Sequence, residues 1–273
     1  MPDSIGSFVR HAARAACLLL FVTSPAAAQF LYTPPPLAQP PDTAQFLSRY
    51  DFHLYGVGLA EDNDAFSWDT HWGGDFDFVD YVYGRATVVA DYQAIFGREF
   101  RPFDPNQGNY VLEAAGSYRF GRNELFGVVH HESRHLSDRP KRFHIAWNEL
   151  DARLLRRLTH GTSTYDLRLE AGKMIATGFV DYSWDANADL MYRRPLSPHT
   201  ALFGRAFGTL IGIDGSASDR PLQKGGRIEA GVRLIGTSGA LELLGGYERV
   251  IDASALERMP REWVFGGIRL VPK

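Results

Sequence analysis

Polar and apolar residues alternate along most of this chain, in segments longer than an ordinary strand. Between Asn109 and Phe120, for example, Asn109 and Glu113 fall on one face while Tyr110 and Leu112 fall on the other. A period of two residues is that of a β-strand with one wet face and one apolar face. The segments run for about 10–14 residues, whereas strands of soluble proteins average about 5–6. This pattern favours strands that cross a membrane.

The composition alone does not reveal this pattern. The 273 residues are 45% hydrophobic and 22% charged, with a net charge of -3, and the mean hydropathy is -0.22. These values exclude a bundle of membrane helices, which needs apolar runs of about 20 residues, and they argue against disorder. The balanced charge argues against a nucleic-acid partner. A membrane β-barrel remains possible because alternation gives its strands an ordinary mean hydropathy.

The first 48 residues predict export. Residues 1–28 have the three parts of a signal peptide: a basic start, an apolar run at Ala15–Val22 and a small-residue cleavage site at Ala26–Ala28. Residues 29–48 are rich in proline and are predicted to form a periplasmic linker, with a short polyproline II binding tail as the alternative. Residues 49–273 are then the barrel domain.

The fold class predicted from the alternation is all-β: a transmembrane antiparallel β-barrel of about 12 strands. The expected strands are 50–60, 74–83, 86–96, 108–120, 123–136, 143–157, 163–175, 178–193, 199–212, 226–236, 239–250 and 262–271. Short connections alternate with longer ones, as between periplasmic turns and outer loops. The segment 74–83 has the weakest pattern, and without it ten strands is the fallback. A soluble lipocalin-like or sandwich fold is the alternative, but long strands with aromatic ends favour the barrel.

A barrel of this kind predicts location and partners. We expect the bacterial cell outer membrane, with outer-membrane lipid around the wall and the barrel-assembly machinery as a partner during biogenesis. The polar faces should point into the lumen, where their mixed charges either line a passage or cross-link into a closed plug. The residues expected there are Asp166, Arg168, Glu170, Asp181, Asp185, Asp189, Arg193, Arg227, Glu229, Arg233 and Glu242. The oligomeric state is left open.

The densest group of chemically active residues is the segment Val128–Asp138 (VVHHESRHLSD). On a strand His131, Ser133 and His135 share one face, and His130, Glu132 and Arg134 share the other. The first interpretation is a hydrogen-bonded brace at the barrel mouth. The second is nucleophilic catalysis by Ser133 and His131, with a carboxylate from Glu149 or Asp151 orienting the ring. The third is a metal site of His131, His135 and Asp138.

The same residues resemble two known families. Residues 131–138, followed by Asn148-Glu149-Leu150-Asp151, resemble the signature of an uncharacterised family of bacterial outer-membrane barrels, with Arg134 and Ser137 at positions where that family has Ser and Gly. The resemblance implies a location and a fold. A shorter match, His131, Ser133 and Glu149, is similar to the His-x-Ser pair and neighbouring Glu of lipid A deacylase barrels. It implies hydrolysis of an outer-leaflet lipid.

The sequence therefore leaves two functions open. The first is a non-enzymatic barrel, structural or passively conducting; the second is a lipid hydrolase with His131, Ser133 and Glu149 as catalytic residues. No cofactor is predicted, and no metal is assigned. An acidic loop, Glu61–Asp64 with Asp69, has enough oxygen ligands for Ca²⁺, but its spacing is not that of a known calcium loop. We expect it to be a solvated outer loop.

Overall fold

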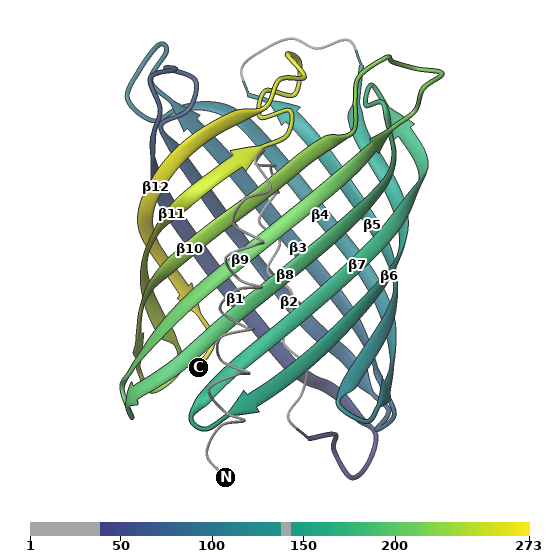
Figure 1. Ribbon diagram of the computed structural model, residues 1–273, viewed down its shortest axis with the longest axis vertical. Helices are drawn as coiled ribbons and strands as arrows, with labels where there is room; N and C mark the ends of the chain where they lie inside the picture. The colour runs from purple at the N-terminus through teal and green to yellow at the C-terminus, as the bar shows by residue number, and fades with distance from the viewer. Residues whose placement is uncertain (1–38, 138–142) are drawn as a thin grey trace, which may run out of the picture.

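The chain folds into one closed barrel of twelve antiparallel strands (Figure 1). The structure is a computed structural model that describes residues 39–137 and 143–273. The strands are β1 (Gln45–Ala60), β2 (Trp68–Asp80), β3 (Arg85–Gly97), β4 (Asp104–Phe120), β5 (Asn123–Leu136), β6 (Ile145–His160), β7 (Ser163–Gly178), β8 (Tyr182–Ser197), β9 (Thr200–Ile213), β10 (Gln223–Ile235), β11 (Ala240–Val250) and β12 (Arg261–Val271). Each strand pairs with its neighbours in sequence. The pairing of β1 with β12, from Leu54–Leu270 to Ala60–Val264, closes the ring.

The two ends of the barrel differ as the sequence predicts. The connections at one end are short, and those at the other end are mostly longer loops; both β1 and β12 have their terminal ends on the short side (Figure 1). Two of the short connections begin with Gly121 and Gly161, at φ of 58° and 59°. Two-residue hairpins need this left-handed conformation, which glycine adopts without strain. We call the two ends the turn end and the loop end.

The prediction of twelve strands is confirmed, including the weakest one. That strand, β2, begins six residues earlier than predicted and ends three residues earlier, because residues 81–84 form the turn. The strand predicted at 178–193 begins at Tyr182, and β1 begins at Gln45, inside the segment predicted as linker. The predicted signal peptide and most of the predicted linker lie outside the described residues. Among the described residues, no helix is long and apolar enough to cross a membrane.

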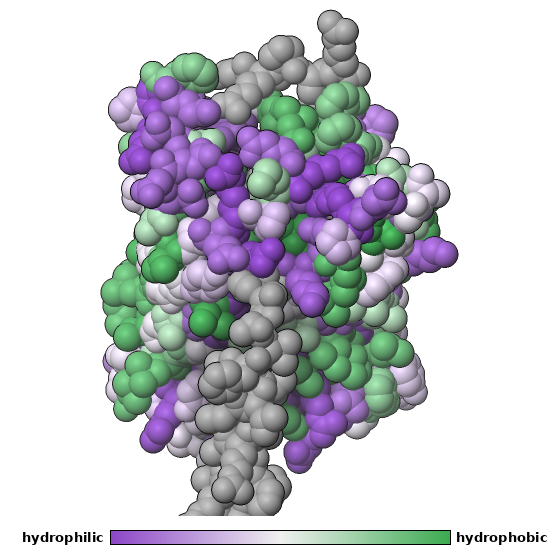
Figure 2. Space-filling model, turned by 45° about the horizontal axis from the view of Figure 1, so that its top comes forward, coloured by the Kyte–Doolittle hydropathy of each residue, from purple (hydrophilic) through white to green (hydrophobic). Residues whose placement is uncertain are grey.

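The barrel is apolar outside and polar inside. On β4, the outward Leu112 is 52% exposed, while the inward Glu113 next to it is 3% exposed. Aliphatic residues cover the middle of the outer wall, and aromatic residues such as Trp68 and Tyr118 lie near its two edges. Figure 2 shows hydrophilic residues gathered at the loop end and hydrophobic residues along the wall. An exposed apolar band with aromatic edges matches a surrounding bilayer.

One outward residue predicted from the alternation points inward instead. Tyr182 lies between Asp181 and Ser183 in an alternating segment, which predicts that it faces lipid with Trp184. Its ring instead lies inside the barrel, edge-on to Trp147 at 5.4 Å between ring centroids. The pairing of β8 with β9 shifts register between Tyr182 and Trp184. Because an inserted residue reverses the alternation, this irregularity turns Tyr182 into the lumen.

Substitution on the outer wall tests the contact with lipid. Ile228 lies near the middle of β10 and Leu234 near its turn end, and both side chains are exposed. We expect Ile228→Arg to lower the free energy of unfolding in phospholipid vesicles by about 2–4 kcal/mol, because it places a charge at mid-bilayer. Leu234→Arg, the matched control near the interface, should cost about 1 kcal/mol or less. Equal costs at both depths, measured by denaturant titration, would contradict a membrane-spanning wall.

Candidate functional site

The lumen holds the charged residues that the alternation predicted to point inward. These acids and arginines are buried or half-buried, and most pair with one another. Asp181 differs in one respect, since it lies in the connection between β7 and β8 rather than within a strand. The question left by the sequence is whether these charges line the wall or cross the barrel.

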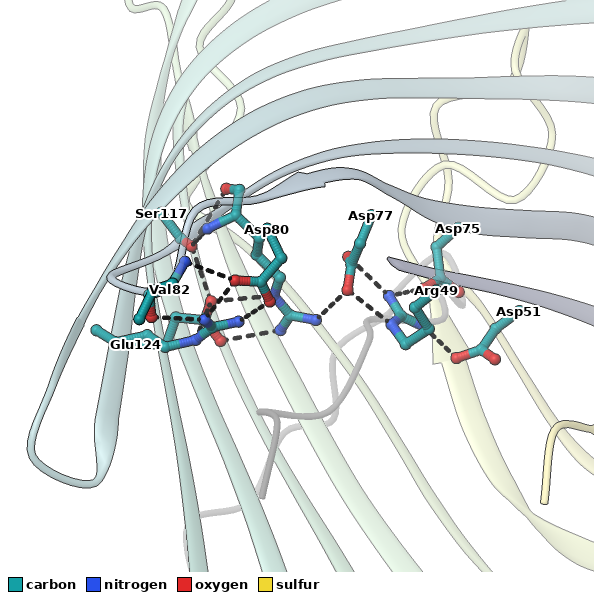
Figure 3. A network of polar contacts seen from close by, with 10 residues as sticks. Arg49, Asp51, Asp75, Asp77, Asp80, Val82, Ser117 and Glu124 are labelled. Atoms are coloured by element: carbon teal, nitrogen blue, oxygen red, sulfur yellow. Dashed lines mark hydrogen bonds and ion pairs between the residues drawn. The ribbon is translucent and has the colours of Figure 1, made fainter. Parts of the chain in front are cut away.

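The ion pairs near the turn end run along the wall of β1 to β5 (Figure 3). Arg85 donates to both carboxylate oxygens of Glu124, at 3.0 and 2.9 Å, and to Asp77 at 3.0 Å. Arg49 donates to both carboxylate oxygens of Asp77, at 3.0 and 3.2 Å, and pairs with Asp75 and Asp51. Ser117 completes the group by donating to Glu124 at 2.8 Å. The contacts link neighbouring strands and strands two apart.

A second group of ion pairs joins β10, β11 and β12. Arg269 donates to Glu242 and to Glu229, both at 2.6 Å. Arg227 donates to the second oxygen of Glu229 at 2.9 Å and to the hydroxyl of Tyr55 at 2.6 Å. These residues are almost fully buried. Buried charges are tolerated when they are paired and hydrogen-bonded in this way, so the group stiffens the seam where the barrel closes.

The loop between β11 and β12 folds into the mouth of the barrel. Ile251, Asp252, Ala253 and Ala255 are all buried, although they belong to a loop of 251–260. Ala253 packs in an apolar cluster inside the barrel that includes Trp263. We call residues 251–260 the cap loop. This fold-back was not predicted, because the sequence of a short loop with both apolar and polar residues does not show which way the loop turns.

Hydrogen bonds to Asp252 hold the cap loop across the mouth of the barrel. The Asp252 carboxylate accepts hydrogen bonds from Tyr182 at 2.7 Å and from Arg220 at 2.6 Å. Its backbone carbonyl accepts one from Arg134 of β5 at 2.8 Å. In a ring of twelve strands, β5 and β11 lie on opposite walls. The cap loop therefore spans the lumen, whereas the ion pairs below it follow the wall.

Arg220 fastens the cap loop from the loop between β9 and β10. It also contacts Asp181 at 3.0 Å. Burial disfavours the charge of this guanidinium, but hydrogen bonding to Asp252 and the charges of Asp252 and Asp181 outweigh burial, so the pKa of Arg220 is raised. The ion pair stays intact at any pH at which the two carboxylates are ionised.

The three predicted catalytic residues lie on two sides of the wall. His131 and Ser133 are on the face of β5 opposite the buried Glu132 and Arg134. The Nδ1 atom of His131 contacts Asn148 Oδ1 at 2.8 Å, and Ser133 Oγ contacts His135 Nε2 at 2.8 Å. Glu149 is buried, and it lines a cavity inside the barrel. The structure does not bring this carboxylate to the Ser–His pair.

A different histidine meets carboxylates in the lumen. One nitrogen of His130 and one carboxylate oxygen each of Glu149 and Asp151 lie within 4.8 Å of one another. The sequence placed His130 on the opposite face from His131, but it did not pair it with these acids. The metal site predicted from His131, His135 and Asp138 stays a prediction, because Asp138 lies outside the described residues.

The acidic loop does not converge on a calcium site. Asp64 pairs with Arg98 at the surface, both more than half exposed. Asp69 instead lies inside the barrel, where it accepts a hydrogen bond from Gln93 at 2.9 Å. Within the described ranges, these carboxylates therefore belong to separate environments.

Comparison with known proteins adds little detail. No protein-family model matches the sequence, and no curated protein matches it either. Among solved structures, the chain is similar to in-vitro folded OmpT, an outer membrane protein of Vibrio cholerae, with 10% identity and a TM-score of 0.42. The match covers 82% of this chain and 96% of that one. The resemblance of residues 131–138 to an uncharacterised barrel family stays a prediction.

Proposed function

We propose that this protein is a non-enzymatic barrel of the bacterial outer membrane, with a polar lumen that the cap loop closes on the extracellular side. The observation that carries the proposal is the contact of Asp252 with Arg134, which joins opposite walls across the mouth. The apolar outer wall and the predicted signal peptide support the location. The role is structural rather than one of free diffusion, and solute passes only if the cap loop moves.

The orientation follows from the two ends. Barrels of this class have short periplasmic turns, longer outer loops and both termini in the periplasm. The turn end of this barrel, which carries the start of β1 and the end of β12, then faces the periplasm, and the cap loop faces the outside. Outer-membrane lipid surrounds the wall, and the barrel-assembly machinery inserts the chain.

Planar-bilayer recording tests the closed lumen. We expect the purified protein, once inserted, to give no steady stepwise conductance at low voltage, because the cap loop blocks the entry to the lumen. Insertion is verified separately by flotation of the protein with lipid vesicles and by its slower gel mobility after boiling. Steady channel openings of an inserted wild-type protein would contradict the proposal and would favour the passively conducting alternative.

We do not propose the lipid hydrolase. Activation of a serine by histidine needs a third group that orients the ring. The residue expected in that role, Glu149, faces the lumen, and the ring nitrogen of His131 contacts the amide oxygen of Asn148 instead. His131, Ser133 and His135 fit the brace interpretation better, as a short hydrogen-bonded row near the loop end of β5.

A further inference from the structure

We infer that the lumen binds one divalent transition-metal cation of the zinc class, held by His130, Glu149 and Asp151 beneath the cap loop. The ligand atoms of these residues lie within 4.8 Å of one another. A tetrahedral zinc site with bonds of about 2.1 Å sets its ligand atoms about 3.4 Å apart. Small rotations of the side chains would therefore bring the three onto one ion.

The two carboxylates lack the arginine partners that most other lumen acids have. Glu149 is 5% exposed and Asp151 is 8% exposed. Among the described residues, Oε1 of Glu149 and Oδ1 of Asp151 have no hydrogen-bond partner, and neither acid has an arginine within ion-pair distance. Elsewhere in the lumen Glu113 and Glu229 are each held by arginine. A buried ionised carboxylate without a partner is costly, and a bound cation would remove that cost.

The histidine is already oriented for a metal. His130 Nδ1 lies 3.0 Å from Glu113 Oε1, and Arg153 holds Glu113 at 2.8 Å. If Nδ1 donates its hydrogen to Glu113, the lone pair of Nε2 is directed to the side of Glu149, 4.0 Å away. Metal-bound histidines commonly donate their second N–H to a carboxylate in this manner. In the neutral ring, this contact favours the tautomer whose Nε2 lone pair is free.

The strand pairing leaves space for the ion. His130 pairs with Glu149 across β5 and β6, and Gly172 lies between Asp151 and Asp185 on the next strands. A Cβ atom at Gly172 would collide with Asp151 Oδ1 and lie 3.0 Å from Asp185 Oδ1. The glycine therefore gives the Asp151 carboxylate room to lie against the wall beside Asp185. Glu149, Asp185 and His130 also line a cavity of about 100 Å³, which has room for a few water molecules beside an ion.

The donor set selects the class of cation. Imidazole nitrogen with two or three carboxylates suits Zn²⁺ and its neighbours. Mg²⁺ and Ca²⁺ prefer oxygen ligands alone. The inference depends on the lumen wall and not on closure by the cap loop, so a conducting wild-type barrel would leave it standing.

Calorimetric titration with ZnCl₂ tests the site in the full-length folded barrel, in detergent, after removal of metals by a chelator. We expect one Zn²⁺ per chain, retained in millimolar Mg²⁺. Glu149→Gln and Asp151→Asn keep the side-chain shape, and each should weaken binding at least roughly tenfold, with His130→Ala weakening it roughly 100-fold. Asp69→Asn is the matched control, because Asp69 is also a lumen acid near a histidine, and its Zn²⁺ affinity should equal that of wild type.

Measurements on wild type keep the test decisive if a variant fails to fold. X-ray absorption of the zinc-loaded wild-type barrel should show nitrogen and oxygen ligands with the scattering of one imidazole. The site is refuted if the folded, metal-free wild type binds no Zn²⁺, if its spectrum lacks imidazole scattering, or if excess Mg²⁺ displaces the ion. Unchanged affinity in folded His130→Ala, Glu149→Gln and Asp151→Asn would refute it equally.

Discussion

Replacing Arg269 with methionine should lower the free energy of unfolding by about 3–5 kcal/mol, one of the largest effects of a single change in this barrel. The guanidinium is 2% exposed and holds Glu229 and Glu242 at 2.6 Å each. Methionine fills part of its space but leaves two buried carboxylates without this cation. Denaturant titration of the barrel in lipid vesicles, followed by tryptophan fluorescence, measures the loss.

Two further variants test whether the loss of stability comes from leaving buried carboxylates without a cation. Arg269→Met combined with Glu229→Gln and Glu242→Gln should recover most of the loss, because removing a whole buried ion group is often nearly neutral. Arg98→Met is the surface control. Arg98 is 57% exposed in its pair with Asp64, and exposed pairs contribute about 1 kcal/mol or less. A cost for Arg269→Met no greater than that for Arg98→Met would show that water reaches and screens the buried group.

The alternation predicted the fold well because a membrane wall imposes it at nearly every residue. Each strand must keep its apolar face to lipid and its polar face to the lumen, so the pattern is dense enough to find twelve strands. Predictions failed where the alternation breaks. Tyr182 turned inward at a register shift, and no local pattern reports such a shift, since it depends on the partner strand.

The predicted catalytic site shows a second limit. Residues that pair directly across two antiparallel strands point to the same side, and Glu149 pairs with His130 rather than with His131. A shift of one residue in this register would have placed Glu149 beside His131 on the outer face. The connection between β5 and β6, residues 137–144, is too long for turn geometry to fix the register. The alternation therefore assigned His130 and His131 to opposite faces, but it could not show which residues of the next strand they meet.

The inward fold of the cap loop was not predicted from the sequence either, because this fold depends on contacts between distant parts of the chain. Asp252 meets Arg134, Tyr182 and Arg220 only after the barrel has closed. The loop is thus the part of the structure with the clearest consequence for passage through the lumen.

Shortening the cap loop should convert the closed barrel into a conducting one. If residues 252–258 are replaced by Gly-Ser, β11 and β12 remain joined, but the contacts of Asp252 across the mouth are lost. The ion pairs described above join strands no more than two apart, and the hydrogen bond of Arg227 to Tyr55 joins strands three apart, so these contacts follow the wall. We expect stepwise conductance at least roughly tenfold above the wild-type background in planar bilayers, since a barrel of this size can hold a narrow pore.

The loop between β9 and β10 offers the matched control. Removal of residues 214–219, of which five are exposed and one is half-buried, shortens a loop at the same end but leaves Arg220 on Asp252. This variant should stay at the wild-type background. Conductance from both deletions would mean that shortening any loop at this end opens the barrel. If the cap-loop deletion inserts fully but gives no conductance, the barrier lies deeper in the lumen, among the paired charges of the wall. The cap loop would then not be what closes the barrel.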